Sequence, residues 1–180
     1  MVTTPERAGE DEFAAIYRHY LDYVWHSVRR LGVAERDLED VTHEVFIAVH
    51  RKLADYDRAR PIKPWLFGFA FRVVSDYRRA PARRAEPTED AGADQAADSG
   101  RHSPERLAER REAMALVQTA LAELAHDDRA VFIAVDLDGG AVPAVAEALD
   151  IPLNTAYSRL RRARITISER LGRPATGGSP

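Results

Sequence analysis

Two short helical patterns joined by a tight turn, near the C-terminal end of the chain, constrain its fold most strongly. The first runs through AVPAVAEAL (residues 141–149), whose apolar residues recur at helical spacing. Pro152 then interrupts the pattern, because proline pushes the preceding residue out of helical geometry. A second helix is expected to start with a cap at Asn154 or Thr155. Its predicted inward stripe is Ala156, Leu160, Ala163, Ile167 and Leu171.

The outward face of this second helix carries arginine and hydroxyl groups. The candidate DNA-reading residues on it are Thr155, Tyr157, Ser158, Arg159, Arg161 and Arg162. Guanidinium and hydroxyl groups on a helix that enters the major groove can contact base edges and phosphates. An exposed charged face can equally be a solvated surface, so the rest of the chain has to decide between these interpretations.

The remaining sequence predicts an all-α protein of two small helical domains. In the first domain (residues 10–80) and the second (residues 105–172), apolar residues recur at helical spacing. Residues 81–104 contain no large aliphatic or aromatic residue, which predicts a flexible linker. Residues 1–9 and 173–180 are expected to be disordered tails.

The boundaries of the expected helices follow from apolar spacing, caps and turns. In the first domain they cover residues 10–31, 34–53 and 63–79. In the second domain one helix runs to residue 124, and a further one, capped by Asp127 or Asp128, runs to Leu137. The helix-turn-helix then completes the domain.

Composition excludes several classes of function. The chain has no cysteine, which excludes disulfides, thiolate metal sites and cysteine nucleophiles. No apolar run approaches the roughly 20 residues that span a bilayer, and no signal peptide pattern is present. We therefore expect a cytoplasmic protein without membrane insertion. The six histidines are scattered and no phosphate loop or nucleophile elbow occurs, so neither an enzyme nor a bound cofactor or metal is expected.

The charge distribution indicates how the chain would reach DNA. The formal net charge is −3, and the acidic excess lies in residues 81–105 between two neutral blocks. Phosphate contacts provide most non-specific DNA affinity. A neutral chain with an acidic segment should bind free DNA weakly, which favours a protein that another molecule delivers to DNA.

Several segments together resemble bacterial RNA polymerase sigma factors of the extracytoplasmic-function (ECF) type, in the sigma-70 family. DLEDVTHEVFIAVHRKLADYD (residues 37–57), followed by PWLFGFA and DYRR, resembles region 2 of that family. LAELAHDDRAVFIAVDLDGG and IPLNTAYSRLRRAR resemble region 4. The resemblance implies a sigma factor that binds core RNA polymerase, directs it to promoter DNA and assists melting. It also implies an anti-sigma factor as a further partner.

By resemblance, the helix that contains EDVTHEVF docks on the largest polymerase subunit. Asp40, His43 and Glu44 would face basic residues there. The family usually has glutamine where His43 stands. Without the resemblance, a solvated acidic face is the simpler interpretation.

The resemblance assigns reading of the minus-ten promoter element to residues 56–79. Cations near phosphates and a flat apolar surface for an unstacked base suit that task. Trp65 and Phe69 also lie at core spacing, and a core role is our preferred interpretation of Trp65. Gly68 and Phe71 stand where the family commonly has basic residues, and Arg72 where asparagine is common. The candidate minus-ten residues are Arg58, Arg60, Lys63, Trp65, Phe69, Arg72 and Arg79.

For the minus-thirty-five element, the resemblance points to Ser158, Arg161 and Arg162. Arg159 and Arg164 lie nearer to the inward stripe and can instead pack along the domain surface or contact polymerase. An alternative function is a helix-turn-helix transcription regulator that binds duplex operator DNA without polymerase. That alternative accounts for the C-terminal segment but not for the acidic second helix or the aromatic third helix.

Overall fold

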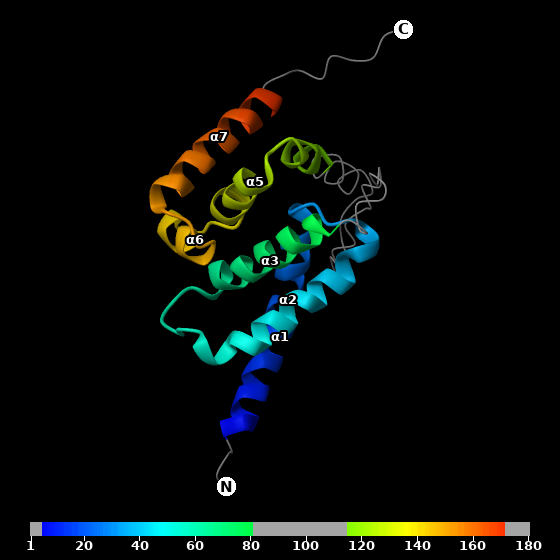
Figure 1. Ribbon diagram of the computed structural model, residues 1–180, viewed down its shortest axis with the longest axis vertical. Coiled ribbons are helices and arrows are strands. Elements are labelled where there is room, and N and C mark those ends of the chain that lie inside the picture. Colours follow the sequence, from blue (N-terminus) through cyan, green and yellow to red (C-terminus); the bar gives the residue numbers. More distant parts are fainter. Residues whose placement is uncertain (1–4, 81–114, 172–180) are drawn as a thin grey trace, which may run out of the picture.

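The computed structural model describes residues 5–80 and 115–171, and every regular element in these ranges is helical (Figure 1). This confirms the all-α prediction. The predicted linker at residues 81–104 and the predicted C-terminal tail at residues 173–180 lie outside the described residues.

The N-terminal domain consists of α1 (Pro5–Arg30), α2 (Leu38–Lys52) and α3 (Ile62–Arg79). Short 3-10 turns precede and follow α2, at η1 (Glu35–Asp37) and η2 (Leu53–Asp55). The three helices occur close to where apolar spacing places them. Residues 5–9 differ from the expectation, because they belong to α1 and are not part of a disordered tail.

The core of the N-terminal domain is formed by the inward faces of these helices. From α2 it includes Leu38, Val41, Thr42, Val45, Phe46 and Val49. From α3 it includes Leu66, Phe67, Ala70, Val74 and Tyr77. Helix α1 ends at Arg30 and is followed by Gly32, whose φ of +96° favours a residue without a Cβ. The following chain can therefore turn back and place α2 against α1.

The C-terminal domain begins, within the described residues, with a helical segment at residues 115–122. It continues through α5 (His126–Phe132), a π-helical turn η4 (Ile133–Leu137), α6 (Val142–Ala148) and α7 (Leu153–Leu171). Helices α6 and α7 form the predicted helix-turn-helix. Its inward stripe is confirmed at Ala156, Leu160 and Ala163, whereas Leu171 is exposed.

Two helix starts differ from the sequence expectation. The N-cap of α5 is Ala125, and Asp127 and Asp128 lie in its first turn. Helix α7 starts at Leu153, so Asn154 and Thr155 are also inside the first turn. The carboxylates of Asp127 and Asp128 bind arginines of α7 instead of capping their own helix.

The two domains pack against each other in this structure. Helix α3 lies beside α6 (Figure 1), and the buried apolar residues of both domains belong to a single cluster. His126 of α5 stacks on Phe71 of α3, with ring centroids 5.0 Å apart. Its Nε2 lies 2.9 Å from Oγ of Ser75. The sequence did not predict this contact between domains.

We expect acid to destabilise the folded chain through His126. Burial, followed by the charge of Arg78, lowers the pKa of His126 from 6.5 to about 4. The unfolded chain binds this proton more readily, so the stabilisation is complete above about pH 6.5 and is lost as the pH falls towards about 4. Urea unfolding between pH 4 and 7 measures this loss. His126→Asn should flatten the dependence, and an unchanged slope in that variant would contradict the assignment.

Candidate nucleic-acid interface

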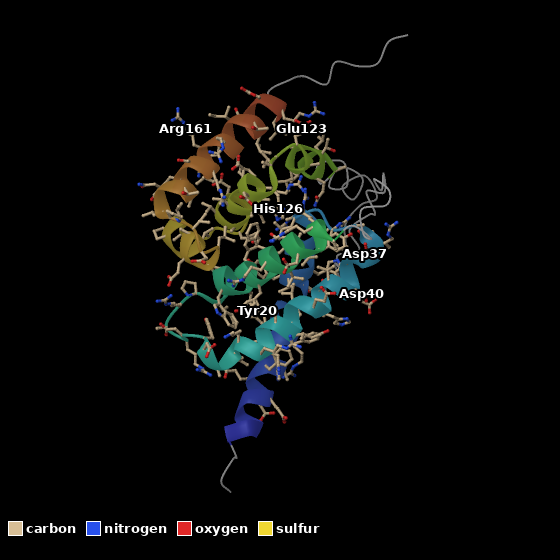
Figure 2. All side chains as sticks on the ribbon, in the orientation of Figure 1. Tyr20, Asp37, Asp40, Glu123, His126 and Arg161 are labelled. Carbon is tan, nitrogen blue, oxygen red and sulfur yellow. The ribbon has the colours of Figure 1, made fainter. Side chains whose placement is uncertain are left out.

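Helix α7 presents an exposed polar face on the side away from α5. Tyr157 is 52% exposed, and Asn154, Ser158 and Arg161 are also exposed. Oγ of Ser158 donates a hydrogen bond to the backbone oxygen of Asn154 at 2.9 Å. Arg161 points away from the body of the molecule (Figure 2). Spacings of three and four residues place these side chains on one helical face.

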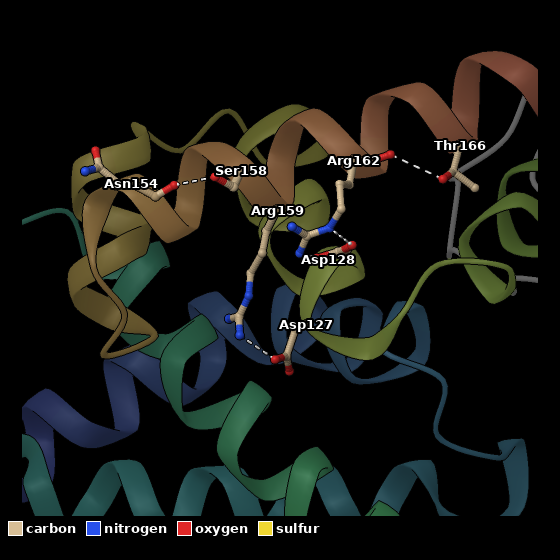
Figure 3. Close-up of polar contacts among 7 residues, drawn as sticks. All are labelled: Asp127, Asp128, Asn154, Ser158, Arg159, Arg162 and Thr166. Carbon is tan, nitrogen blue, oxygen red and sulfur yellow. Dashed lines mark hydrogen bonds and ion pairs between the residues drawn. The ribbon is translucent and has the colours of Figure 1, made fainter.

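Three arginines of α7 each bind a carboxylate of the α5–η4 segment. Arg159 Nη2 lies 2.5 Å from Asp127 Oδ2, and Arg162 binds Asp128 through two hydrogen bonds of 2.9 and 2.6 Å (Figure 3). Arg164 binds Asp136 in the same two-bond manner, at 2.8 and 2.6 Å. Paired planar groups of this kind give strong and directional contacts. These ion pairs therefore hold α7 against the α5–η4 segment.

Opposite charges hold Arg162 and Asp128 together. The Asp128 side chain is largely buried, whereas the arginine side chain stays exposed. The hydrogen bond and charge of Asp128 raise the pKa of Arg162 above its usual value. Among Arg159, Arg161, Arg162 and Arg164, Arg161 is the one that has no carboxylate partner in the part of the chain that the structure describes.

An aromatic group lies at the start of α3, where the sequence places its minus-ten candidates. Trp65 packs between Tyr56 and Phe69, with ring centroids 4.6 and 4.9 Å away. Trp65 is half-buried and remains partly accessible. Phe69 is only 9% exposed, so in this state it supports Trp65 and offers little surface of its own to a base.

The candidate minus-ten cations are all exposed, but their contacts differ. Lys63 Nζ lies 5.5 Å from the centre of the Tyr23 ring, and the guanidinium of Arg72 lies 4.9 Å from that of Phe69.

The remaining three cations are held by carboxylates. Arg58 binds Glu12, Arg79 binds Asp76, and Arg60 binds both Asp57 and Glu147 of α6. Lys63 and Arg72 are thus the candidate cations that lie over aromatic rings, those of Tyr23 and Phe69.

A third exposed surface lies on α2. Asp40, His43 and Glu44 are all exposed on the side opposite the core (Asp40 is labelled in Figure 2). Ile47 extends this face and is 51% exposed. Sequence reasoning missed Ile47, although it follows Glu44 at helical spacing and so interrupts a polar face with an apolar side chain.

The structure places the candidates on α2, on α3 with the loop before it, and on α7, with Arg79 apart from the other minus-ten candidates in the last turn of α3. The α2 and α3 surfaces belong to the N-terminal domain and the α7 surface to the C-terminal domain. Asp128 was not a candidate, yet it sets the position of Arg162. Within the described residues no group of three or more histidine, cysteine, aspartate or glutamate side chains could hold a metal ion. None of the helices described is long and apolar enough to cross a membrane.

Comparison with known proteins identifies both domains. The family described as Sigma-70 region 2 matches residues 16–84, and the family described as Sigma-70, region 4 matches residues 114–167. The RNA polymerase sigma factor NccH of Alcaligenes xylosoxydans xylosoxydans is 30% identical over 147 residues, which cover 79% of this chain and 77% of the relative. The chain belongs to the ECF group of the sigma-70 family. Its N-terminal domain is region 2, and its C-terminal domain is region 4.

Other similar proteins agree with this family. The ECF RNA polymerase sigma-E factor of Escherichia coli K12 is 28% identical, over 95% of this chain and 92% of its own length. The structure of CnrH in complex with the cytosolic domain of CnrY has a TM-score of 0.62 at 24% identity, over 91% of this chain and 89% of that one. The sigma factor RpoE in complex with the anti-sigma factor NepR from Bartonella quintana has a TM-score of 0.65 at 18% identity, over 89% and 97%. These two structures share the fold of this sigma factor.

Proposed function

We propose that this sigma factor works in the cytoplasm, where it binds core RNA polymerase through the exposed face of α2 and promoter DNA through the surfaces on α3 and α7. The observation that carries this proposal is the matching of regions 2 and 4 in family order. Each region exposes a surface of suitable chemistry. Region 2 exposes an acidic face and a cation–aromatic surface, and region 4 exposes the polar face of α7.

A reconstituted transcription assay tests this function. Purified chain is added to sigma-free core polymerase, and transcripts from a promoter library are sequenced. Transcripts that start at a defined set of promoters, and only with the chain present, would support the proposal. Tight binding of a dimer to duplex operator without polymerase, together with no transcript, would instead favour the regulator.

For the minus-thirty-five element we propose that Arg161 provides the main base contact of α7. It is exposed and has no carboxylate partner among the described residues. Arginine can form two hydrogen bonds with guanine in the major groove. Thr155, Tyr157 and Ser158 lie near it towards the start of α7 and would contact phosphates or neighbouring bases.

The other two α7 candidates, Arg159 and Arg162, take a different role in this proposal. Both bind carboxylates of α5 in the free protein. They would therefore position the reading helix and would not themselves select the promoter sequence.

For the minus-ten element we propose that Trp65, Lys63 and Arg72 form the contact surface. Trp65 is partly accessible, and the two cations lie over the rings of Tyr23 and Phe69. A base that leaves the duplex can stack on an aromatic side chain while cations hold its phosphates. In this structure Arg58, Arg60 and Arg79 each bind a carboxylate. Each would have to give up that ion pair in order to contact a phosphate.

An anti-sigma factor is the further partner that we propose. Two solved sigma factors of this fold were captured with CnrY and with the anti-sigma factor NepR, respectively. Co-expression of the tagged chain with genes that neighbour its own would test this partner. A protein that co-purifies with it and blocks its binding to core polymerase would support the proposal.

Asp40→Arg should weaken binding to core polymerase by about tenfold, because reversal of one charge turns attraction to a basic partner into repulsion. Fluorescence anisotropy of labelled chain titrated with core enzyme measures the affinity. Glu169→Arg is a matched control, since Glu169 is exposed on α7 in the other domain. Equal affinity for both variants would show that the α2 face is only a solvated surface.

A further inference from the structure

Many outward side chains of α7 already have partners inside the protein. Three of its arginines bind carboxylates of the α5–η4 segment, as described above. The hydroxyls of Ser158 and Thr166 donate hydrogen bonds to backbone oxygens one turn earlier, at 2.9 and 3.2 Å (Figure 3). A donor of this kind has to give up its partner before it can bind a base, which costs free energy. Base reading by α7 therefore falls first on outward side chains that have no such partner.

Tyr157 is a large outward side chain of α7 that has no such partner. It is 52% exposed, and its hydroxyl and ring have no hydrogen-bond or ring partner in the part of the chain that the structure describes. Leu153, one turn earlier, is 43% exposed. Arg161, one turn later, is the exposed arginine assigned above to guanine. Because residues four apart share a helical face, two apolar side chains and one guanidinium form a single strip along the leading half of α7.

The chemistry of this strip determines which base it can read. In the major groove, thymine presents its C5-methyl group, whereas guanine, adenine and cytosine are distinguished by hydrogen-bonding atoms. An apolar side chain reads the thymine methyl by burying it. The ring of Tyr157 and the side chain of Leu153 are suited to this contact. The tyrosine hydroxyl can stay in water at the same time, because tyrosine has an apolar body and a polar tip.

The spacing along α7 sets the separation of the two bases. Tyr157 and Arg161 lie about one turn apart, and one turn of an α-helix rises about 5.4 Å. Successive bases of one DNA strand are about 3.4 Å apart along the duplex. A base read by Tyr157 should therefore lie one or two base pairs from the base read by Arg161.

We propose that Tyr157, supported by Leu153, reads the methyl group of a thymine in the minus-thirty-five element, one or two base pairs from the guanine that Arg161 contacts. This inference rests on the proposed function, since it takes α7 as the helix that enters the major groove. It makes Tyr157 a specificity-determining residue. The ligand is duplex DNA in which a 5-methyl group and a guanine edge lie close together.

Replacement of thymine by uracil tests the methyl group by itself, because the two bases differ only in that group. The probe is the promoter with the highest transcript yield in the library assay described above. Each thymine of its minus-thirty-five element, on either strand, is replaced by uracil in turn. Affinity of the reconstituted holoenzyme, measured by fluorescence anisotropy, should fall about fourfold at one position, the effect of burying one methyl-sized group. That position should lie within two base pairs of the one identified by Arg161→Ala.

Tyr157→Ala should remove this preference, so that the thymine and uracil duplexes bind with equal affinity. Alanine has the highest helix propensity and Tyr157 is exposed, so α7 should stay folded. Tyr157→Phe keeps the ring and should keep the fourfold preference. Leu171→Ala is a matched control, because it removes a side chain that is 59% exposed about 21 Å further along the helix. This control should behave like the parent.

The possible results separate the methyl contact from the proposed function. A thymine preference that persists in Tyr157→Ala would overturn the role of Tyr157. Equal loss of affinity for thymine and uracil duplexes in Tyr157→Phe would show that the hydroxyl binds a phosphate, which would also overturn methyl reading. Transcription from defined promoters with no uracil effect at any position would overturn this inference alone. If no transcript depends on the chain, the proposed function fails and the inference fails with it.

Discussion

Arg161→Ala should weaken recognition of a minus-thirty-five element by about 5- to 150-fold, the equivalent of 1–3 kcal/mol for an arginine that pairs with one base. Arg161 is exposed on α7 and points away from the domain (Figure 2). Its removal should therefore leave region 4 folded. Promoter affinity of the reconstituted holoenzyme, measured against duplexes changed at single positions, should lose its preference at one position.

Arg162→Ala provides the informative comparison. Its guanidinium is held by Asp128 (Figure 3), so this variant should mainly leave a buried carboxylate without a partner. A lower midpoint of thermal unfolding, with sequence preference retained, is the expected pattern. If Arg162→Ala changes base preference and Arg161→Ala does not, our assignment of the two arginines is reversed.

Phe67→Ala should lower the free energy of unfolding by about 3–5 kcal/mol, the usual cost of removing a buried aromatic ring. Phe67 is 1% exposed and is among the largest fully buried side chains. Urea denaturation followed by circular dichroism measures the change. If Phe67→Ala does not fold, Phe67→Leu, which should lose less stability, is measured in its place. Ile47→Ala, an apolar truncation on the exposed face of α2, should cost far less. Equal losses for the two alanine variants would show that the region 2 core is not organised around Phe67.

The helices and the helix-turn-helix could be predicted from the sequence because they depend on local information. Apolar residues at helical spacing marked the inward faces of α2 and α7, and Gly32 and Pro152 marked a helix end and a turn. Family resemblance then placed the candidate surfaces on α2, α3 and α7. Helix starts were less accurate, because Asp127 and Asp128 have cap chemistry but bind arginines that lie far along the chain.

Tertiary structure alone decided the roles of side chains with the same local pattern. Trp65, Phe67, Phe69 and Phe71 alternate along α3, yet Phe67 enters the core while Phe71 meets His126 of the other domain. The arginines of α7 look alike in sequence, but Asp127, Asp128, Asp136 and Glu123 bind four of them, whereas Arg161 has no carboxylate partner among the described residues.

The docking of the two domains could not be predicted from the sequence either. It depends on the close approach of Ala148 to Gly68, where an added Cβ would lie 2.4 Å from the Ala148 backbone oxygen, and on the bridge from Asp138 to α1. Apolar spacing shows which side of a helix is buried, but not which partner buries it. Local sequence therefore determined the elements and their inward faces, whereas long-range contacts decided which outward groups remain free to bind.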